Sequence, residues 1–483
     1  MPTDRSSANA ATLPTTPSGW IAEIGGALVM ALAAAGLLAV AFWMQRHDWE
    51  YGRERSALIA LCALLVFVLR WPSRPLRFFS SRALIAIAWI AMATALGLDL
   101  RVGLESVTHV QSTGEIRLDQ GQNLLRSSQL LLRGEDPYGR GALVDLEAYS
   151  TRFRSRVDAG LTPQIPREQI RGMLARYAFQ PDPQLRELLL PTPSAPRTPD
   201  AELEYSLLGH KYGPLPVLLV TPFVQFGRAC IPALQLVAFF GWIAALLWML
   251  RSPALRLAPG AIPIALMLVL IEPHVAHNYL YDSASDAWGL AFCALALGAH
   301  LRDRRLLSGV AVALALACKI FPAALFLPLL VVGPWPSIRR AGLACVATLA
   351  VLFGPFLLWD AHGLWLNLVA WPSLMAPDNT GWISYVPTAA STIRLCLTAL
   401  LAVLSLANIL GLRPARGQSR LWAFVRVDSA RLPAHFALAS ACAVLAGSAF
   451  HNNYVPWVTS WSFCAITIAF ASSRESSSAP AVT

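Results

Sequence analysis

The chain has 483 residues, of which 56% are hydrophobic and only 14% are charged, and its formal net charge is +10. A soluble domain of this composition would lack the polar surface needed to cover itself, so the composition excludes a soluble protein and predicts an all-α polytopic membrane protein. The positive charge does not call for a nucleic-acid partner, because arginines in short loops orient a membrane protein.

The chain begins with a polar stretch, residues 1–19, that we expect to be a disordered cytoplasmic tail. The apolar run at 20–44 is longer than a signal-peptide core of about 7 to 15 residues, so it is predicted to be a retained span. With the run at 56–71 it gives two extra N-terminal helices within residues 20–82. Ten further runs bring the prediction to about twelve transmembrane helices, at 83–100, 230–250, 257–275, 286–301, 306–318, 320–334, 341–358, 386–411, 433–449 and 455–472.

Clusters of arginine predict the orientation of these spans. An even number of spans places both termini on one side, and the arginine-rich short loops place that side in the cytoplasm of an inner or plasma membrane. The runs at 306–318 and 320–334 allow two interpretations, a hairpin with Lys319 at its tip or one kinked helix. Arginines precede and follow this pair, which favours the hairpin because it keeps both clusters on one face.

Residues 101–229 are predicted to form one large extracytoplasmic loop. Within it, Leu124–Leu132 is amphipathic and is expected to lie on the membrane surface as a short interfacial helix. The apolar stretch near 214–227 is only about half a bilayer long, so it is expected to be re-entrant and packed against protein.

Neither a disulfide framework nor a metal site is expected. All eight cysteines fall in apolar runs without zinc-ligand spacing, and His274 and His277 lack a third ligand at a suitable spacing. We therefore predict no metal and no cofactor.

Polar side chains gather in the loops predicted to face outward. A carboxylate just after a span acts on substrates at the membrane surface, and a cation at membrane depth costs about 3 kcal/mol unless it snorkels or holds an anion such as a lipid phosphate. The tyrosines are also compatible with an aromatic belt. The candidate residues are Glu115, Asp119, Tyr138, Lys211, Tyr212, Asp282, Asp286, Lys319, Arg394, His451 and Tyr454.

An ordered set of motifs resembles a known family. It comprises an acidic residue before Gly134-Glu-Asp-Pro-Tyr138, the run Lys211-Tyr-Gly-Pro-Leu-Pro216, the stretch Ser308-Gly309 to Lys319, and a closing loop with His451. This order, from about residue 83 to the end, resembles the C-type glycosyltransferases, in particular glycosyltransferase family 87, which includes polyprenyl-phosphate-mannose-dependent mannosyltransferases.

The resemblance implies an inverting transfer of a hexose such as mannose from a polyprenyl-phosphate donor to a lipid or glycan acceptor. An aspartate of the first outer loop acts as general base in such enzymes, and by position it is Asp119. Glu115 remains the alternative base, because Tyr138 lies 19 residues beyond Asp119 and the family's aromatic residues are here Gln122 and Asn123.

The chemistry suggests roles for the other candidates. A sugar phosphate on a lipid is already activated, so the protein needs a base, an aligned acceptor and a cation for the leaving phosphate. Lys319 and Arg394 are the predicted phosphate ligands. The predicted sugar or acceptor ligands are Tyr138, Lys211, Tyr212, Asp282, Asp286, His451 and Tyr454.

A transporter or flippase of lipid-linked saccharides is the alternative function. The absence of a convincing internal repeat and the position of the polar groups at one surface favour the enzyme, because transporters build their sites from repeats at the midplane.

Overall fold

The computed structural model describes residues 82–116, 119–138, 210, 212–272, 274–282, 284–331, 334–365, 367–368, 432–446 and 454–471. These residues belong to one compact unit, Ser73–Thr483, and they are helical, with no β-strand among them. The predicted tail, the spans at 20–44, 56–71 and 386–411, and most of the outer loop lie outside the described residues.

The first described helix, α3, spans Arg82–Thr113 and is longer than predicted. The predicted span ends at residue 100, where the hydropathy falls, and that boundary is wrong because the helix continues to Thr113. The helix continues because the following residues contain no proline, and Arg101 Nε bonds Glu105 Oε1 at 2.8 Å one turn later. It ends at Gly114, whose φ of 71° suits glycine after a helix.

The next helix, α4, spans Asp119–Leu132 and is mostly buried. The expected surface helix at Leu124–Leu132 is therefore wrong, since Leu124 is only 1% exposed. The apolar side of α4 packs in a cluster with Val217 and Val220 of α9. Amphipathicity predicted a helix with two different faces, but both faces meet protein.

The short segment predicted to be re-entrant consists of α9, Pro214–Val220, and the 3₁₀ helix η2, Thr221–Phe226. Together they are too short to cross a bilayer, as expected, and they pack against α4 and α10. Helix α10 spans Cys230–Leu250, the range predicted from hydropathy.

The remaining described elements follow in order. They are η3 Pro253–Leu255, α11 Ala261–Leu270, the π-helix η4 Val275–Tyr281, α12 Asp286–His300, α13 Arg305–Cys318, α14 Ile320–Ala323, η5 Ala324–Leu330, α15 Trp335–Trp365, α19 Leu432–Ala446 and α20 Val455–Ala471.

Three described helices are long and apolar enough to cross a membrane: Ile85–Thr113, Cys230–Leu250 and Trp335–Ala361. A fourth results if α11 and η4, which are bent by 65° relative to each other, count as one broken span. The other described apolar helices are shorter than a straight crossing.

The predicted span at 320–334 is not one regular helix. Lys319 ends α13 in an extended conformation, with φ of −153° and ψ of 103°, and is followed by α14 and the 3₁₀ helix η5. The single kinked helix is therefore not what the chain forms here. Both short elements pack against α13, as a hairpin requires.

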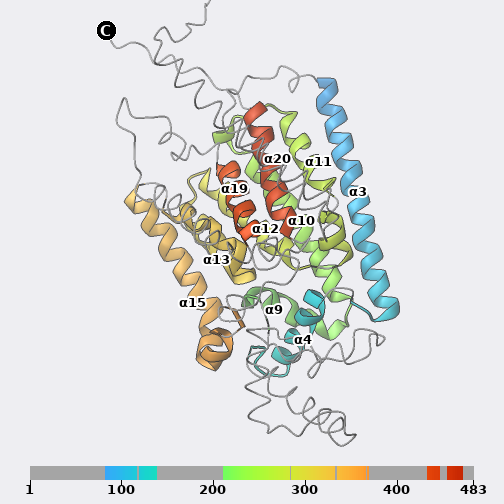
Figure 1. Cartoon of the computed structure of the whole chain (residues 1–483), viewed down its shortest axis with the longest axis vertical. Helices are drawn as coiled ribbons and strands as arrows, with labels where there is room; N and C mark the ends of the chain where they lie inside the picture. Colours follow the sequence, from blue (N-terminus) through green and yellow to red (C-terminus); the bar gives the residue numbers. More distant parts are fainter. Residues whose placement is uncertain are drawn as a thin grey trace, which may run out of the picture. The chain divides into compact units, whose positions relative to one another are not determined.

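Glycines allow close contact among the central helices. Figure 1 shows α15, α13, α12, α10 and α3 side by side in this order, and each contacts the next. A Cβ at Gly309 of α13 would lie 2.1 Å from the Ala341 carbonyl oxygen of α15. The last helix, α20, packs against α11 and α19.

Candidate active site

A buried ion pair lies where α12 begins and α13 ends. Lys319 Nζ lies 2.6 Å from Asp286 Oδ1, and their side chains are 8% and 0% exposed. The extended backbone at Lys319 interrupts the helix at this point. Because an isolated buried charge is costly, each partner makes the position of the other tolerable.

Helix α20 and the segment before α9 enclose this pair. The indole N–H of Trp457 donates to Asp286 Oδ1 at 2.8 Å. The ammonium of Lys319 lies 4.4 Å from the ring centre of Tyr454 and 5.7 Å from that of Tyr212. Aromatic faces stabilise a cation, so the lysine is held by one carboxylate and two rings.

Two glycines make these contacts possible. A Cβ at Gly289, one turn after Asp286, would lie 2.9 Å from the indole ring of Trp457. Gly213 fits directly against α13, and its N–H donates to the Cys318 carbonyl at 3.3 Å. Both contacts need the absence of a side chain, which gives these positions a structural reason to be glycine.

The Gly134–Tyr138 turn, which follows α4, supports Tyr212. Asp136 Oδ1 accepts a bond from the Tyr138 N–H at 2.9 Å, a turn typical of Asp before Pro. The Tyr138 hydroxyl donates to the Tyr212 carbonyl at 2.8 Å, and Asn367 donates to the Tyr138 carbonyl at 2.9 Å. Burial raises the pKa of Tyr138 well above its ordinary value, so this hydroxyl stays protonated and donates.

His210 joins the same turn to α4. The backbone N–H of His210 donates to the Pro137 carbonyl at 2.8 Å, and the ring Nδ1 lies 3.0 Å from Asn123 Oδ1. Burial lowers the pKa of His210 to about 3, so the ring is neutral near pH 7. A neutral ring can donate to the asparagine oxygen and fixes the turn without adding charge.

The start of α4 lies beside the start of α12. Helix α4 begins at Asp119, and the neighbouring Gln120 accepts a bond from the Ser285 N–H at 3.3 Å. Ser285 directly precedes Asp286, so this bond joins the first turn of α4 to the start of α12. Glu115 lies in the link between α3 and α4 and is exposed.

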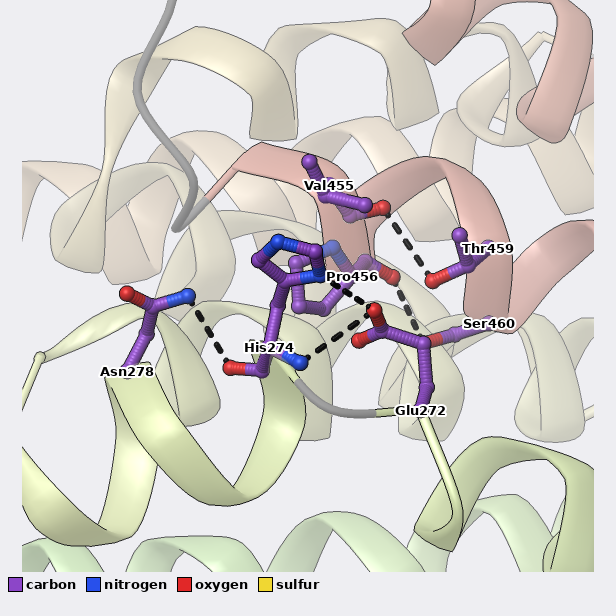
Figure 2. A network of polar contacts seen from close by, with 7 residues as sticks. All are labelled: Glu272, His274, Asn278, Val455, Pro456, Thr459 and Ser460. Atoms are coloured by element: carbon purple, nitrogen blue, oxygen red, sulfur yellow. Dashed lines mark hydrogen bonds and ion pairs between the residues drawn. The ribbon is translucent and has the colours of Figure 1, made fainter. Parts of the chain in front are cut away.

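A second polar cluster lies beside the first turn of α20. Glu272 Oε1 accepts bonds from His274 Nδ1 at 2.6 Å and from its N–H at 3.2 Å. Figure 2 draws this cluster together with the first turn of α20, and α11, which ends just before Glu272, packs against α20. Asn278 donates to the His274 carbonyl at 3.0 Å. The cluster therefore borders the segment that carries Tyr454 and Trp457.

The structure separates the predicted site residues into groups. His277 Nε2 lies 3.4 Å from Asp282 Oδ2, and Tyr138 contacts the backbone of Tyr212. Lys211, Arg394 and His451 lie outside the described residues, as does the side chain of Asp119. The residues that meet around the ammonium are Tyr212, Asp286, Lys319 and Tyr454.

Trp457 is the residue that the sequence analysis missed, because it reads as an ordinary aromatic of the last span. The available signal was its position one helical turn after Tyr454. Among the residues that the structure describes, no group of three His, Cys, Asp or Glu side chains could hold a metal ion.

Long apolar helices and a buried, aromatic-lined ion pair define a membrane protein with a polar site among its helices. Residues 210–451, half of the chain, match the model of glycosyltransferase family 87, and the chain belongs to this family. It is therefore a membrane glycosyltransferase, as the motif order predicted. No curated protein and no solved structure matches the chain significantly.

Proposed function

We propose that the protein transfers a hexose such as mannose from a polyprenyl-phosphate donor to a lipid or glycan acceptor at the extracytoplasmic face of the inner or plasma membrane. Lys319 contacts the donor phosphate, and Asp119 is the general base. The transfer inverts the anomeric centre. The predicted ligands of the sugar and acceptor keep the roles given from the sequence, except that Tyr138 acts through Tyr212 and Asp286 acts through Lys319.

One observation carries this proposal: three distant segments meet at the Asp286–Lys319 pair. Gln120 of the predicted first outer loop accepts a bond from Ser285, the residue before Asp286. Trp457 of α20 donates to Asp286 itself. Displacement of a phosphate requires a base for the acceptor hydroxyl and a cation for the leaving oxygen. Asp119 at the start of α4 is proposed as the base, and Lys319 as the cation.

The proposed reaction is a single displacement. The acceptor hydroxyl attacks the anomeric carbon and forms the new glycosidic bond, while the bond from that carbon to the phosphate oxygen breaks. The electron pair leaves with the lipid phosphate, and the hydroxyl proton passes to the carboxylate of Asp119. Lys319 stabilises the charge that grows on the leaving oxygen.

The test replaces the base without changing its size. Asp119→Asn keeps hydrogen bonding but cannot accept the proton, so turnover should fall about 100-fold or more with little change in donor binding. The measurement is transfer of sugar from a synthetic polyprenyl-phosphate hexose by the purified protein in lipid nanodiscs.

Glu115→Gln is the matched control, because it removes a nearby carboxylate from the α3–α4 link, and its effect should be mild. Normal turnover of Asp119→Asn, or a large loss at Glu115 instead, would assign the base to another carboxylate.

A further inference from the structure

The charge of Lys319 is balanced inside the protein before any substrate arrives. Its ammonium lies 2.6 Å from Asp286 Oδ1, and the Trp457 N–H donates to the same oxygen at 2.8 Å. One carboxylate oxygen thus accepts bonds from an ammonium and an indole N–H, which makes this a charge-assisted ion pair. The pair therefore has zero net charge.

The described groups that face this pair do not change that balance near neutral pH. Among the side chains that the structure describes, the titratable ones facing the pair are phenols and a thiol, groups that ordinarily carry no charge at this pH: Tyr212, Tyr454, Tyr279 and Cys318. The nearby His210 is also neutral, because burial lowers its pKa to about 3. The His274–Glu272 pair beside α20 is the remaining titratable neighbour within the described part of the chain.

We propose that Asp286 makes the site selective for a phosphodiester with one negative charge over a phosphate monoester with two. This proposal rests on the proposed function, in which Lys319 contacts the donor phosphate. The donor, a sugar joined to a lipid through phosphate, is the diester. The lipid phosphate that leaves is the monoester, whose second pKa is about 6.

The physical reason is the charge left in the site. The single positive charge of Lys319 can balance one negative charge, and the carboxylate of Asp286 is already that charge. A bound diester leaves one net negative charge near the carboxylate, whereas the monoester dianion leaves two. Asp286 thus retains the donor better than the product and promotes release of the lipid phosphate after transfer.

If the charge of Lys319 were not balanced by Asp286, binding of the monoester would change with pH in the opposite direction. Without Asp286, the dianion would be attracted more strongly than the monoanion, and its binding would tighten as the pH rises through about 6. With Asp286 charged, binding of the monoester should weaken over the same range. The direction of this change separates the two arrangements.

The first experiment measures binding of a short polyprenyl monophosphate and of its methyl phosphodiester to the wild-type protein in nanodiscs at pH 5.5 and 7.5. The monoester should bind several-fold more tightly at pH 5.5, whereas binding of the diester should stay constant. The diester keeps one charge throughout, so it controls for titration of protein groups such as His274. Monoester binding that is unchanged or tighter at pH 7.5 would overturn the proposal.

The second experiment removes the charge of Asp286. Asp286→Asn keeps an oxygen acceptor for Trp457, and it should raise monoester affinity at pH 7.5 about tenfold or more, with a smaller gain for the diester. Asp303→Asn is the matched control, because this aspartate is 78% exposed in the connection between α12 and α13. It should leave both affinities unchanged. Equal gains for both ligands in Asp286→Asn would contradict selectivity.

Failure of this inference is distinguishable from failure of the proposed function. The neutral double variant Lys319→Met/Asp286→Asn removes the cation without leaving a buried carboxylate alone. If it binds both ligands as tightly as Asp286→Asn does, Lys319 does not contact the phosphate, and the proposed function fails. If it weakens both ligands while the wild-type protein shows no preference, only the selectivity fails. The wild-type measurement stands even if a variant does not fold.

Discussion

Gly213 lies against the carbonyl group of Ala317 so closely that a Cβ at this position would approach the oxygen to 2.1 Å. The obstructing atom belongs to the backbone of α13, so no side-chain rotation could relieve the contact. Since Tyr212 precedes this glycine and faces Lys319, the contact fixes the distance between the segment before α9 and the ion pair.

Gly213→Ala should therefore displace Tyr212 from Lys319. We expect sugar transfer to fall between about tenfold and 100-fold, because a misplacement of about 1 Å in a positioned site can cost about 100-fold. Transfer assays at varied donor concentration measure the effect. Gly241→Ala in α10 is the matched control, because nothing lies within 4 Å of a Cβ there. Wild-type donor KM and turnover in Gly213→Ala would contradict this role.

Lys319→Met should destabilise the fold as well as weaken donor binding, because it leaves Asp286 buried without its cation. Breaking one partner of a buried pair costs about 3 to 5 kcal/mol, whereas replacing both is often neutral. The double variant Lys319→Met/Asp286→Asn should then recover most of the thermal stability but not the activity. Thermal unfolding in detergent, followed by fluorescence, measures the first quantity.

If the single variant is as stable as the wild-type protein, the buried pair does not contribute as the structure indicates. If the double variant regains full transfer, the lysine has no role in the reaction. These two outcomes are independent, since one concerns folding and the other chemistry.

His210 should make the protein less stable in acid. Its pKa in the folded state is lowered to about 3, below the ordinary value of 6.5, so the unfolded chain takes up the proton first as the pH falls. The stability is complete above pH 6.5 and is lost progressively down to about pH 3. By pH 5 the loss from this residue is about 2 kcal/mol.

The measurement compares the melting temperature at pH 7.5 and pH 5 for the wild-type protein and His210→Gln, which cannot be protonated. The variant should show a smaller acid-induced shift, whatever its stability at pH 7.5. An identical shift in both proteins would show that other groups cause the acid sensitivity. His277→Gln is the control, because His277 is exposed.

The outer loop should react with reagents outside the cell. Ser194→Cys places a thiol in the polar part of the sequence between α4 and α9, and the eight natural cysteines fall in apolar runs. Labelling by a membrane-impermeant thiol reagent in intact cells, after permeabilisation of any outer membrane, is the expected result. Labelling only after lysis of the inner membrane would reverse the orientation and the side on which transfer occurs.

Hydropathy predicted the membrane class and several helices, including α10 at both of its ends. It failed for the end of α3, where helix propensity outlasts hydropathy, and for the surroundings of α4, which depend on tertiary packing. At residue 101 the hydropathy falls, but helix propensity and the Arg101–Glu105 pair continue the helix to Thr113. In α4, amphipathicity could not reveal that the polar face meets His210 and the rest of the protein instead of water.

The candidate site was predicted as separate residues rather than as an arrangement. Lys319 was predicted from the cost of a cation at membrane depth, and Asp286 from its place in a loop expected to face outward. Their pairing is a tertiary contact over 33 residues, and no periodicity in the sequence encodes it. Trp457 reaches Asp286 over 171 residues, so a sequence pattern alone had no reason to select it.

The distances along the chain from Asp286 to Lys319 and to Trp457 also imply an order of assembly during biosynthesis. Asp286 and Lys319 leave the ribosome only 33 residues apart, so their charges can neutralise each other as soon as α12 and α13 pack together. The indole of Trp457 is added only when the final helix is synthesised. The family match ends at residue 451, before Tyr454 and Trp457. A nascent chain released at that boundary would contain both charges of the ion pair but would lack the two aromatic side chains that α20 and the residue before it place against them.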